Sequence, residues 1–351
     1  MLTAFDALAA SPWSVLETQR MQPFQFEPHG LSPELSVQAL QRIEHEKKQF
    51  AVSSRHFNVL QHRASYYAPY VLAKCRERGV PLEIALLPMV ESVYDPFALS
   101  QDGAAGLWQL MPSTAIQLGV EINWWYDGRR DIEDSTDAAL DYLTKMYKRF
   151  DDWALALAAY NAGPARISRL IKKNKKAGGS GNYWELDLPR ETARYVPRLL
   201  ALRELSLKID SATVLDGELP FHFIELDHQI DLLQVAKFID GDIEELYKLN
   251  AGLNRWATPA AGPHRIWVPS EKAAEFERKL AELKREDMIS WSRYVIQPGD
   301  SLSKVAVKKR SRTDWISAAN QLADAVIKEN QALIIPRLGG GGGSDLSLID
   351  I

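Results

Sequence analysis

A single carboxylate, Glu91, is the residue of this chain best placed to do acid–base chemistry. It lies in the almost wholly apolar stretch of residues 81–93, so its carboxyl is expected among apolar side chains. Burial disfavours the charged form and raises the pKa, which would leave Glu91 protonated near neutral pH. A protonated carboxyl can donate a proton to a glycosidic oxygen. Taken alone, an ordinary carboxylate at a helix end is the commoner interpretation.

Three further segments follow the Glu91-Ser92 pair in a fixed order. They are Gly-Leu-Trp-Gln-Leu-Met-Pro at residues 106–112, Ala-Ala-Tyr-Asn-Ala-Gly at 158–163 and Leu-Pro-Arg-Glu-Thr-Ala-Arg-Tyr-Val at 188–196. Together the four segments resemble the catalytic domain of the soluble lytic transglycosylases, lysozyme-like enzymes that cut peptidoglycan. The resemblance covers roughly residues 60–205. Each segment alone is a weak signal, but four in register are a strong one.

The resemblance assigns the catalytic role to Glu91 and implies a groove around it that binds sugars. Ser100 corresponds to a hydroxyl close to the acid, and Tyr160 is the expected contact to the sugar or to Glu91. Tyr142 and Tyr195 are weaker candidates, because aromatic residues at helical spacing usually belong to a core. The full set of predicted substrate-binding residues is Ser92, Ser100, Gln109, Met111, Tyr142, Tyr160, Asn161 and Tyr195.

In this family the β-1,4 bond between MurNAc and GlcNAc is cleaved without water. The resemblance implies that Glu91 protonates the leaving oxygen and then takes the proton of the MurNAc C6 hydroxyl, whose oxygen closes a 1,6-anhydro ring on C1. A hydrolase of the ordinary kind needs a second carboxylate at a defined separation. The nearby acids Asp95 and Asp102 precede proline and glycine, and they are predicted to shape turns.

Two other functions stay open at this point. One is a lysozyme-type hydrolase on the same fold, whose products would be heavier by one water. The other is a catalytically silent protein that binds the cell wall, which the intact Glu91, Ser92, Gln109 and Tyr160 argue against. The sequence shows no metal-ligand cluster, phosphate-binding loop or nucleophile elbow, so no metal and no cofactor are expected.

Tryptophans near the motifs admit two interpretations. Trp108 stands where many family members have Met, and it could stack on a sugar or fill the core. The Trp-Trp-Tyr run at residues 124–126 could form a glycan platform, but a packed corner is favoured.

Length and composition indicate a globular protein of two or three domains. The chain has 351 residues, of which 46% are hydrophobic and 25% charged. Its net charge of −4 gives no sign of nucleic-acid binding. No apolar run approaches the length of a membrane span. The single cysteine, Cys75, follows a helical apolar pattern and is predicted to be a core thiol.

Both ends of the chain lie outside the expected fold. Residues 1–30 contain several prolines and are predicted to form an arm along the next domain. Members of the family are periplasmic, exported outer-membrane lipoproteins with a lipid on an N-terminal cysteine, so we expect this chain to be a mature region without its signal and anchor. Residues 339–344 are typical of an artificial Gly/Ser linker. The appended peptide 345–351 could suit strand addition to a protein partner or be a tag.

Residues 31–209 are predicted to form the all-helical, lysozyme-like catalytic domain. The helices are expected over about 33–55, 56–78, 81–93, 113–118, from Asp134 or Ser135 to 150, over 153–160 and over 191–208. Pro88 should bend or shorten the third of these one turn before Glu91. The apolar helix at 153–160 should be buried on all sides. Residues 172–182 are predicted to form a basic surface loop.

Two small strand–helix–helix–strand modules are predicted after the catalytic domain, at residues 210–285 and 286–338. They resemble each other, since Val235 and Val305 precede Asn250 and Asn320 by the same 15 residues. The second module begins with Tyr-Val-Ile-Gln-Pro-Gly-Asp-Ser-Leu, which resembles the glycan-binding LysM module. Its predicted glycan-binding residues are Gly299, Asp300, Ser301, Leu302 and Asn320.

The first module lacks the Gly-Asp-Ser-Leu turn, so a structural role is favoured for it over glycan binding. Its long loop carries Asn-Arg-Trp-Ala-Thr at residues 254–258 and Gly-Pro-His-Arg at 262–265. These runs are typical of the D-type branch of the family. A single LysM module usually binds weakly, and its expected contribution is to concentrate the enzyme on peptidoglycan strands.

Overall fold

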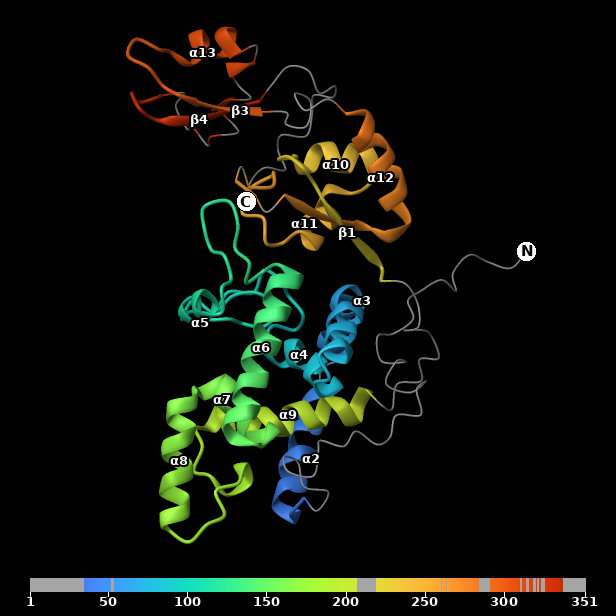
Figure 1. The fold of residues 1–351 in the computed structure, drawn as a ribbon, viewed down its shortest axis with the longest axis vertical. Coiled ribbons are helices and arrows are strands. Elements are labelled where there is room, and N and C mark those ends of the chain that lie inside the picture. Colours follow the sequence, from blue (N-terminus) through green and yellow to red (C-terminus); the bar gives the residue numbers. More distant parts are fainter. Residues whose placement is uncertain are drawn as a thin grey trace, which may run out of the picture. The chain divides into compact units, whose positions relative to one another are not determined.

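The computed structural model describes residues 35–51, 54–206, 219–259, 261–262, 264–283, 291–309, 311–313, 316–317, 320, 322 and 326–336. The chain divides into two compact units (Figure 1). One comprises Met1–Phe221 and Lys248–Asn254, and the other comprises His222–Tyr247 and Arg255–Ile351. The arm predicted over residues 1–30 and the tail at 339–351 lie outside the described residues. Within the described part, no helix has both the length and the apolar character needed to cross a membrane.

Helices build the first unit, which confirms the mainly α prediction for the catalytic region. The elements in chain order are α2 (Val37–Ala51), α3 (Ser54–Glu77), the 3₁₀ helix η1 (Leu82–Leu86), α4 (Leu87–Glu91), α5 (Pro112–Gln117), α6 (Ile132–Phe150), α7 (Trp153–Ala162), α8 (Pro164–Lys176), the 3₁₀ helix η2 (Tyr183–Glu185) and α9 (Arg190–Ser206).

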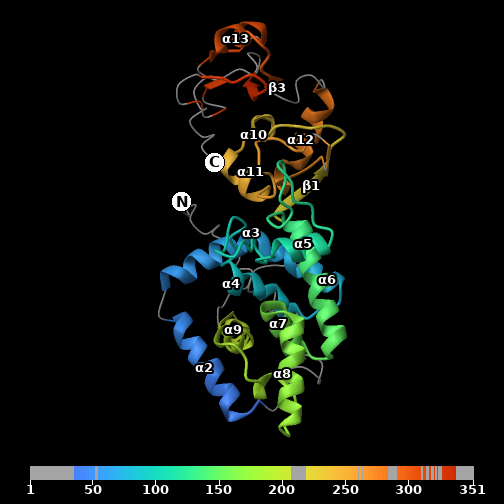
Figure 2. The same ribbon diagram turned by 90° about the vertical axis from the view of Figure 1, so that its left-hand side faces the viewer.

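The helix α7 is the centre of this unit. Its residues from Trp153 to Ala159 are all buried. It packs against α6, α8 and α9, and Figure 2 shows α8 and α9 beside it. A helix that is apolar on every side needs neighbours on every side, and the many alanines of α7 let those neighbours approach closely. The prediction of a buried central helix is confirmed.

Pro88 interrupts the stretch that carries Glu91, as predicted. Residues 81–93 form η1 and then the short helix α4, with Pro88 in the first turn of α4. Proline has no backbone N–H to donate and clashes with the preceding turn, so it starts a helix more readily than it continues one. As a result Glu91 is the last residue of α4 rather than an interior helical residue.

Two predicted boundaries were wrong. The N-cap of α6 is Asp131, whose carboxylate accepts hydrogen bonds from the amides of Glu133 and Asp134. Asp134 and Ser135 are therefore first-turn residues and not caps. The predicted basic loop from Lys172 is also shorter than expected, because α8 continues to Lys176. Nothing in the sequence breaks that helix before Gly178.

The first repeat contains β1 (Phe221–Glu225), α10 (Leu232–Ile239), α11 (Ile243–Leu249) and β2 (Arg265–Pro269), and β1 pairs with β2. This is the predicted strand–helix–helix–strand order. It is followed by α12 (Ser270–Glu282), a helix that the sequence reasoning missed and that packs against α10.

The second repeat contains β3 (Trp291–Val295), α13 (Leu302–Lys309) and β4 (Ala332–Pro336). The strands pair antiparallel, in a register that runs from Trp291 opposite Pro336 to Val295 opposite Ala332. Its small core contains Ile296, Leu302, Val305, Ala306, Ile316, Leu333 and Ile335. Part of the predicted second helix lies outside the described residues.

Candidate active site

The chain turns sharply directly after Glu91. Val93 and Tyr94 have φ angles of 55° and 54°, in the left-handed region that residues other than glycine rarely adopt. The amides of Ser92 and Tyr94 both donate to the Pro88 carbonyl, at 3.0 and 3.1 Å. From a fully buried position, the Tyr94 hydroxyl donates to the Ala85 carbonyl at 2.5 Å. These bonds hold a strained turn that fixes the direction in which the Glu91 side chain leaves α4.

Ser92 joins this turn to the second motif. Its buried hydroxyl lies 2.9 Å from the Leu107 carbonyl, to which it donates, and it accepts a bond from the Asp95 amide at 3.2 Å. The hydroxyl therefore sets the spacing between the acid and the loop at residues 98–111. Contact between Ser92 and substrate stays a prediction.

Tyr195 on α9 donates a hydrogen bond from its hydroxyl to Glu91 Oε1. Burial raises the pKa of Glu91 to about 7. The bond from Tyr195 works against this rise because it stabilises the carboxylate, and the negative charge of Glu191 adds to the rise. Glu91 is thus protonated below about pH 7 and ionised above it. A carboxyl that titrates near neutrality can give a proton and take one back.

The loop at residues 98–111 folds on itself beside the acid. Ala105 forms bridges with Leu99 and Leu110, and the Ser100 hydroxyl accepts a bond from the Ala104 amide at 2.9 Å. Gln109 has a φ of 47°, and its side-chain amide donates to the Gly106 carbonyl at 3.0 Å. The side chains of Ser100 and Gln109 are therefore already held in place by the protein.

Solvent exposure differs between the end of this loop and its interior. Met111 is 39% exposed, whereas Trp108 is fully buried and donates from its indole nitrogen to Thr136 Oγ1 at 2.9 Å. Of the two interpretations of Trp108, the structure supports a core residue. Met111 keeps the apolar surface that a sugar face could contact.

Tyr160 lies near the end of α7, and its hydroxyl donates to the Trp108 carbonyl at 2.7 Å. Burial raises its pKa well above the usual range, and the nearby Glu91 charge adds to this. The Tyr142 ring is 5.8 Å from the Tyr160 ring, centroid to centroid. Tyr160 thus contacts the second motif, while the direct hydrogen bond to the acid comes from Tyr195.

Asn161 connects α7 to the first turn of α9. Its carbonyl oxygen accepts a bond from the Thr192 hydroxyl at 2.7 Å, and its amide donates to Glu191 at 3.1 Å. Sequence reasoning missed Glu191 and Thr192 as members of this cluster. A signal was present, since Glu191 precedes Tyr195 by four residues and so shares its face of the helix.

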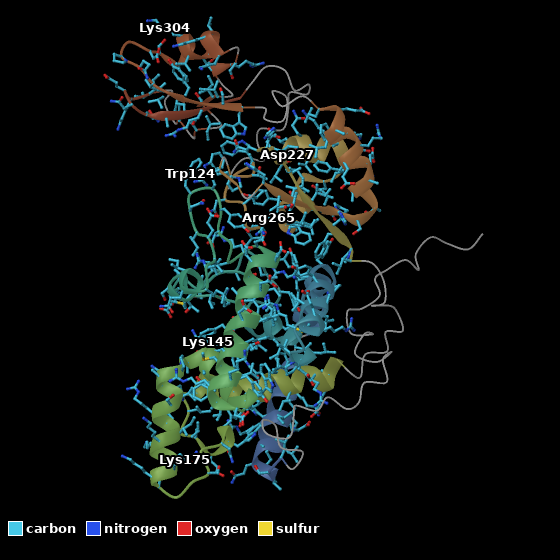
Figure 3. The ribbon with its side chains drawn as sticks, in the orientation of Figure 1. Trp124, Lys145, Lys175, Asp227, Arg265 and Lys304 are labelled. Carbon is cyan, nitrogen blue, oxygen red and sulfur yellow. The ribbon has the colours of Figure 1, made fainter. Side chains whose placement is uncertain are left out.

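The aromatic residues 124–126 divide between packing and solvent. Tyr126 is buried and its hydroxyl donates to Asp134 at 2.8 Å, which agrees with the packed corner that was favoured. Trp124, labelled in Figure 3, is 55% exposed, and its ring lies edge-on to that of Trp125 at 4.9 Å.

The predicted glycan-binding turn of the second repeat is held by its own residues. Gly299 has a φ of 80°, and the Asp300 carboxylate accepts bonds from the Tyr294 hydroxyl and the Gln297 amide, both at 2.8 Å. Ser301 caps α13 by accepting from the Lys304 amide at 3.3 Å. Leu302 is a core residue.

Asn320 closes the second repeat. Its side-chain oxygen accepts from the Ile334 amide at 2.8 Å, and its side-chain nitrogen donates to the Ile334 carbonyl at 2.7 Å. The five predicted residues therefore shape the turn and the fold around it. Their contact with a glycan stays a prediction.

Comparison with known families matches three parts of the chain. Residues 71–182 match the Transglycosylase SLT domain, residues 221–285 match the LysM-like domain of lytic transglycosylase MltD, and residues 294–336 match the LysM domain. The first match includes Glu91 and the two motifs that follow it.

Individual relatives agree with these domains. Membrane-bound lytic murein transglycosylase D of Escherichia coli strain K12 is 33% identical over 309 residues, which cover 84% of this chain and 68% of the relative. Membrane-bound lytic murein transglycosylase F of Desulfosudis oleivorans is 36% identical over 109 residues, 29% of this chain and 23% of the relative.

Among solved structures, an inactive mutant of the lytic transglycosylase Slt of Pseudomonas aeruginosa matches 39% of this chain and 23% of its own, at 26% identity and a TM-score of 0.32. The match is partial, and the assignment follows from the sequence relatives. On the strength of the D-type relative and the three matched domains, the chain belongs to the family of membrane-bound lytic murein transglycosylase D, and it is a lytic murein transglycosylase.

Proposed function

We propose that Glu91 carries out both proton transfers in cleavage of the MurNAc–GlcNAc β-1,4 bond of peptidoglycan, with formation of 1,6-anhydroMurNAc. The observation that carries this assignment is the Glu91 carboxyl itself. It is desolvated, has a pKa of about 7 and receives a hydrogen bond from Tyr195. A single group with this pKa can act as an acid in one step and as a base in the next.

The steps balance without water. Protonated Glu91 transfers its proton to the glycosidic oxygen as the bond from that oxygen to C1 of MurNAc breaks. The sugar passes through an oxocarbenium-like state. The Glu91 carboxylate, stabilised by the Tyr195 hydroxyl, then accepts the proton of the C6 hydroxyl while O6 bonds to C1. Glu91 ends protonated and ready for another cycle.

Neighbouring acids are engaged in other contacts, which supports transglycosylation over hydrolysis. Asp95 pairs with Arg63 at 2.9 Å and accepts a bond from the Phe97 amide at 2.9 Å, as its predicted turn role requires. Glu191 is bonded to Asn161 and lies on the Tyr195 helix. An ordinary hydrolase would need one of these carboxylates to activate a water.

The test is mass spectrometry of fragments released from purified sacculi. Fragments with 1,6-anhydroMurNAc ends are expected. Fragments heavier by one water would make the enzyme a hydrolase, with Glu191 as the first carboxylate to replace. Release of no fragments, while the protein still binds sacculi, would favour a wall-binding protein.

The remaining assignments complete the proposal. The domain bounds are 31–209 for catalysis, 210–285 for the LysM-like module and 286–338 for the LysM module. The LysM turn at residues 299–302 binds glycan, and the LysM domain match supports this. The enzyme acts in the periplasm and its native form is lipid-anchored. The relatives named membrane-bound support the membrane association.

A further inference from the structure

A short segment of the LysM-like match belongs to the catalytic unit. The match spans residues 221–285, yet Lys248–Asn254 groups with the helical unit. We call residues 250–254 the clasp. Asn250, Ala251 and Leu253 within it are 4%, 1% and 4% exposed, so most of the clasp is buried.

The clasp pairs with the turn at residues 121–128. Leu253 forms an antiparallel bridge with Tyr126, and the Asp127 amide donates to the Gly252 carbonyl at 2.8 Å. The Asn254 amide donates to the Trp125 carbonyl at 2.8 Å. The Asn254 side chain also donates to the Asn123 carbonyl at 3.0 Å. The clasp therefore adds a short strand to the turn.

Gly252 is required for this approach. A Cβ at this position would lie 2.7 Å from Cε2 of Tyr126, 2.9 Å from Cβ of Asp131 and 3.3 Å from its Cα. The Tyr126 ring is held by its bond to Asp134, and Asp131 is the N-cap of α6. Neither neighbour can move aside without disturbing α6, so only glycine fits.

The turn at residues 121–128, to which the clasp is hydrogen-bonded, is linked in turn to the loop at residues 98–111 through Arg129. Asp127 receives two bonds from the Arg129 guanidinium, from Nε at 2.9 Å and from Nη2 at 2.7 Å. The remaining nitrogen of Arg129, Nη1, donates to the Gly103 carbonyl at 2.7 Å. Gly106 lies directly against the Arg129 backbone, because a Cβ there would be 1.8 Å from the Arg129 carbonyl oxygen. Asp127 and Arg129 are both buried.

We infer that the clasp, a segment of the LysM-like match that lies within the catalytic unit, positions the substrate-binding loop. Gly252 and Asn254 fix the turn, Asp127 fixes Arg129, and Arg129 fixes the loop that presents Ser100, Gln109 and Met111. The clasp residues are positioning residues, because none of them contacts Glu91. The assignment of the loop to substrate binding rests on the proposed function, whereas the mechanical link from clasp to loop does not.

The test replaces Gly252 with valine and measures two quantities. The first is initial rate on solubilised, uncrosslinked glycan strands. The value of kcat/KM should fall by about tenfold to a hundredfold, mainly through KM, because misplacement of the loop impairs substrate alignment. The pH at which Glu91 titrates should not move. The second is hydrogen exchange of the amides in residues 98–111, which should become faster even if the reaction proved to be hydrolysis.

Gly241→Val is the matched control. It is the same substitution in the same module, and the three atoms nearest to an added Cβ all belong to Ile239, which is neither in the clasp nor in the turn at residues 121–128. Wild-type kcat/KM and wild-type exchange in the loop are expected.

The inference is overturned if Gly252→Val has wild-type kinetics and exchange. It is also overturned if its loss matches the unfolded fraction and exchange rises throughout the chain. If the valine variant does not fold, Asn254→Ala decides, because it removes only side-chain bonds. A folded Asn254→Ala protein should lose about threefold in kcat/KM. Unchanged hydrogen exchange in residues 98–111 of this variant would contradict the proposal that the clasp positions the loop.

Discussion

The two repeats place their helices alike but use the turn before the first helix differently. Leu232 opens α10 and Leu302 opens α13, 70 residues later in the chain. In the first repeat, a returning segment covers the turn. Ala257 forms a bridge with Asp231, and the Thr258 amide donates to the Ile230 carbonyl at 3.0 Å. In the second repeat, the Asp300 carboxylate orders the turn by bonding to Tyr294 and Gln297.

The difference shows how one fold can serve two purposes. The first repeat covers its turn with its own chain and contributes the clasp to the catalytic unit. In the second repeat, the Asn320 side chain instead bonds to strand β4. The turn at residues 299–302 is ordered by hydrogen bonds of Asp300 and Ser301 with residues of the same repeat. We therefore expect the first repeat to support cleavage and the second to support binding to the wall.

The largest effect expected is from Glu91→Gln, which should separate cleavage from binding. Glutamine keeps the shape of the side chain but cannot transfer a proton, so turnover should fall by about a thousandfold or more. Pull-down with sacculi should be unchanged, because the second repeat is untouched. Normal turnover in this variant would remove Glu91 from the mechanism.

The same variant has a built-in check of folding. Burial raises the folded pKa of Glu91 from 4.5 to about 7, so wild-type protein loses stability as pH rises through this window. Glutamine does not ionise, so the folded variant has no buried charge to stabilise at high pH. The Tm of Glu91→Gln should therefore exceed that of wild type at pH 8, with a smaller difference at pH 5. An inverted order would mean that the carboxylate is stabilised by the fold.

A smaller loss is expected for Tyr195→Phe, which removes the hydroxyl that donates a hydrogen bond to Glu91. That bond lowers the pKa of Glu91, so its loss should raise the pKa. The alkaline limb of the kcat profile should move to higher pH, and kcat should drop by about tenfold, since the carboxylate formed in the reaction loses a donor. A pH–rate profile of both proteins measures this. A limb that moves to lower pH would contradict the assignment.

The expected role of the second repeat in binding the cell wall is tested by Asp300→Ala. The turn loses the acceptor for the Tyr294 hydroxyl and the Gln297 amide, so affinity for sacculi should fall by about threefold to tenfold. Asp300→Asn is the matched control, because it keeps an acceptor oxygen and should retain most binding. Rates on soluble strands should be unchanged in both. Equal binding by all three proteins would assign the affinity to another surface.

The smallest functional effect is expected from Thr258→Val in the first repeat. The buried Thr258 hydroxyl accepts a bond from the Ile230 amide at 3.0 Å. Its loss should reduce the free energy of unfolding by about 1–3 kcal/mol, because a buried amide loses its acceptor. Binding to sacculi, measured well below the Tm, should not change. Weaker binding by the folded variant would break the contrast, since the first repeat would then contact glycan.

Much of the catalytic region could be predicted because its signals are local. Pro88 marks the break before Glu91, and the pattern of residues 153–160 gives the buried helix α7. The cap of α6 was misplaced because Asp131, Asp134 and Ser135 are all good capping residues, and only the backbone decides among them.

The contacts that complete the site could not be predicted in the same way. Tyr195 is a weaker candidate in the sequence because aromatic residues at helical spacing usually belong to a core. Helical spacing also does not tell which face turns toward a carboxyl 104 residues away. The pairing of Gly252 with Asp127 joins segments that no short-range pattern relates. Such contacts depend on how elements pack, which periodicity alone does not encode.

The clasp also bears on how such enzymes gain and lose modules. The boundary drawn along the sequence near residue 210 differs from the boundary drawn through contacts, because Lys248–Asn254 belongs with the helices before it. If the clasp positions the loop at residues 98–111 as proposed, we expect a recombination event or an engineered truncation at residue 210 to loosen that loop. The second repeat contributes no segment to the catalytic unit. We therefore expect the number of such repeats to vary among relatives, while the first repeat is inherited together with the catalytic domain.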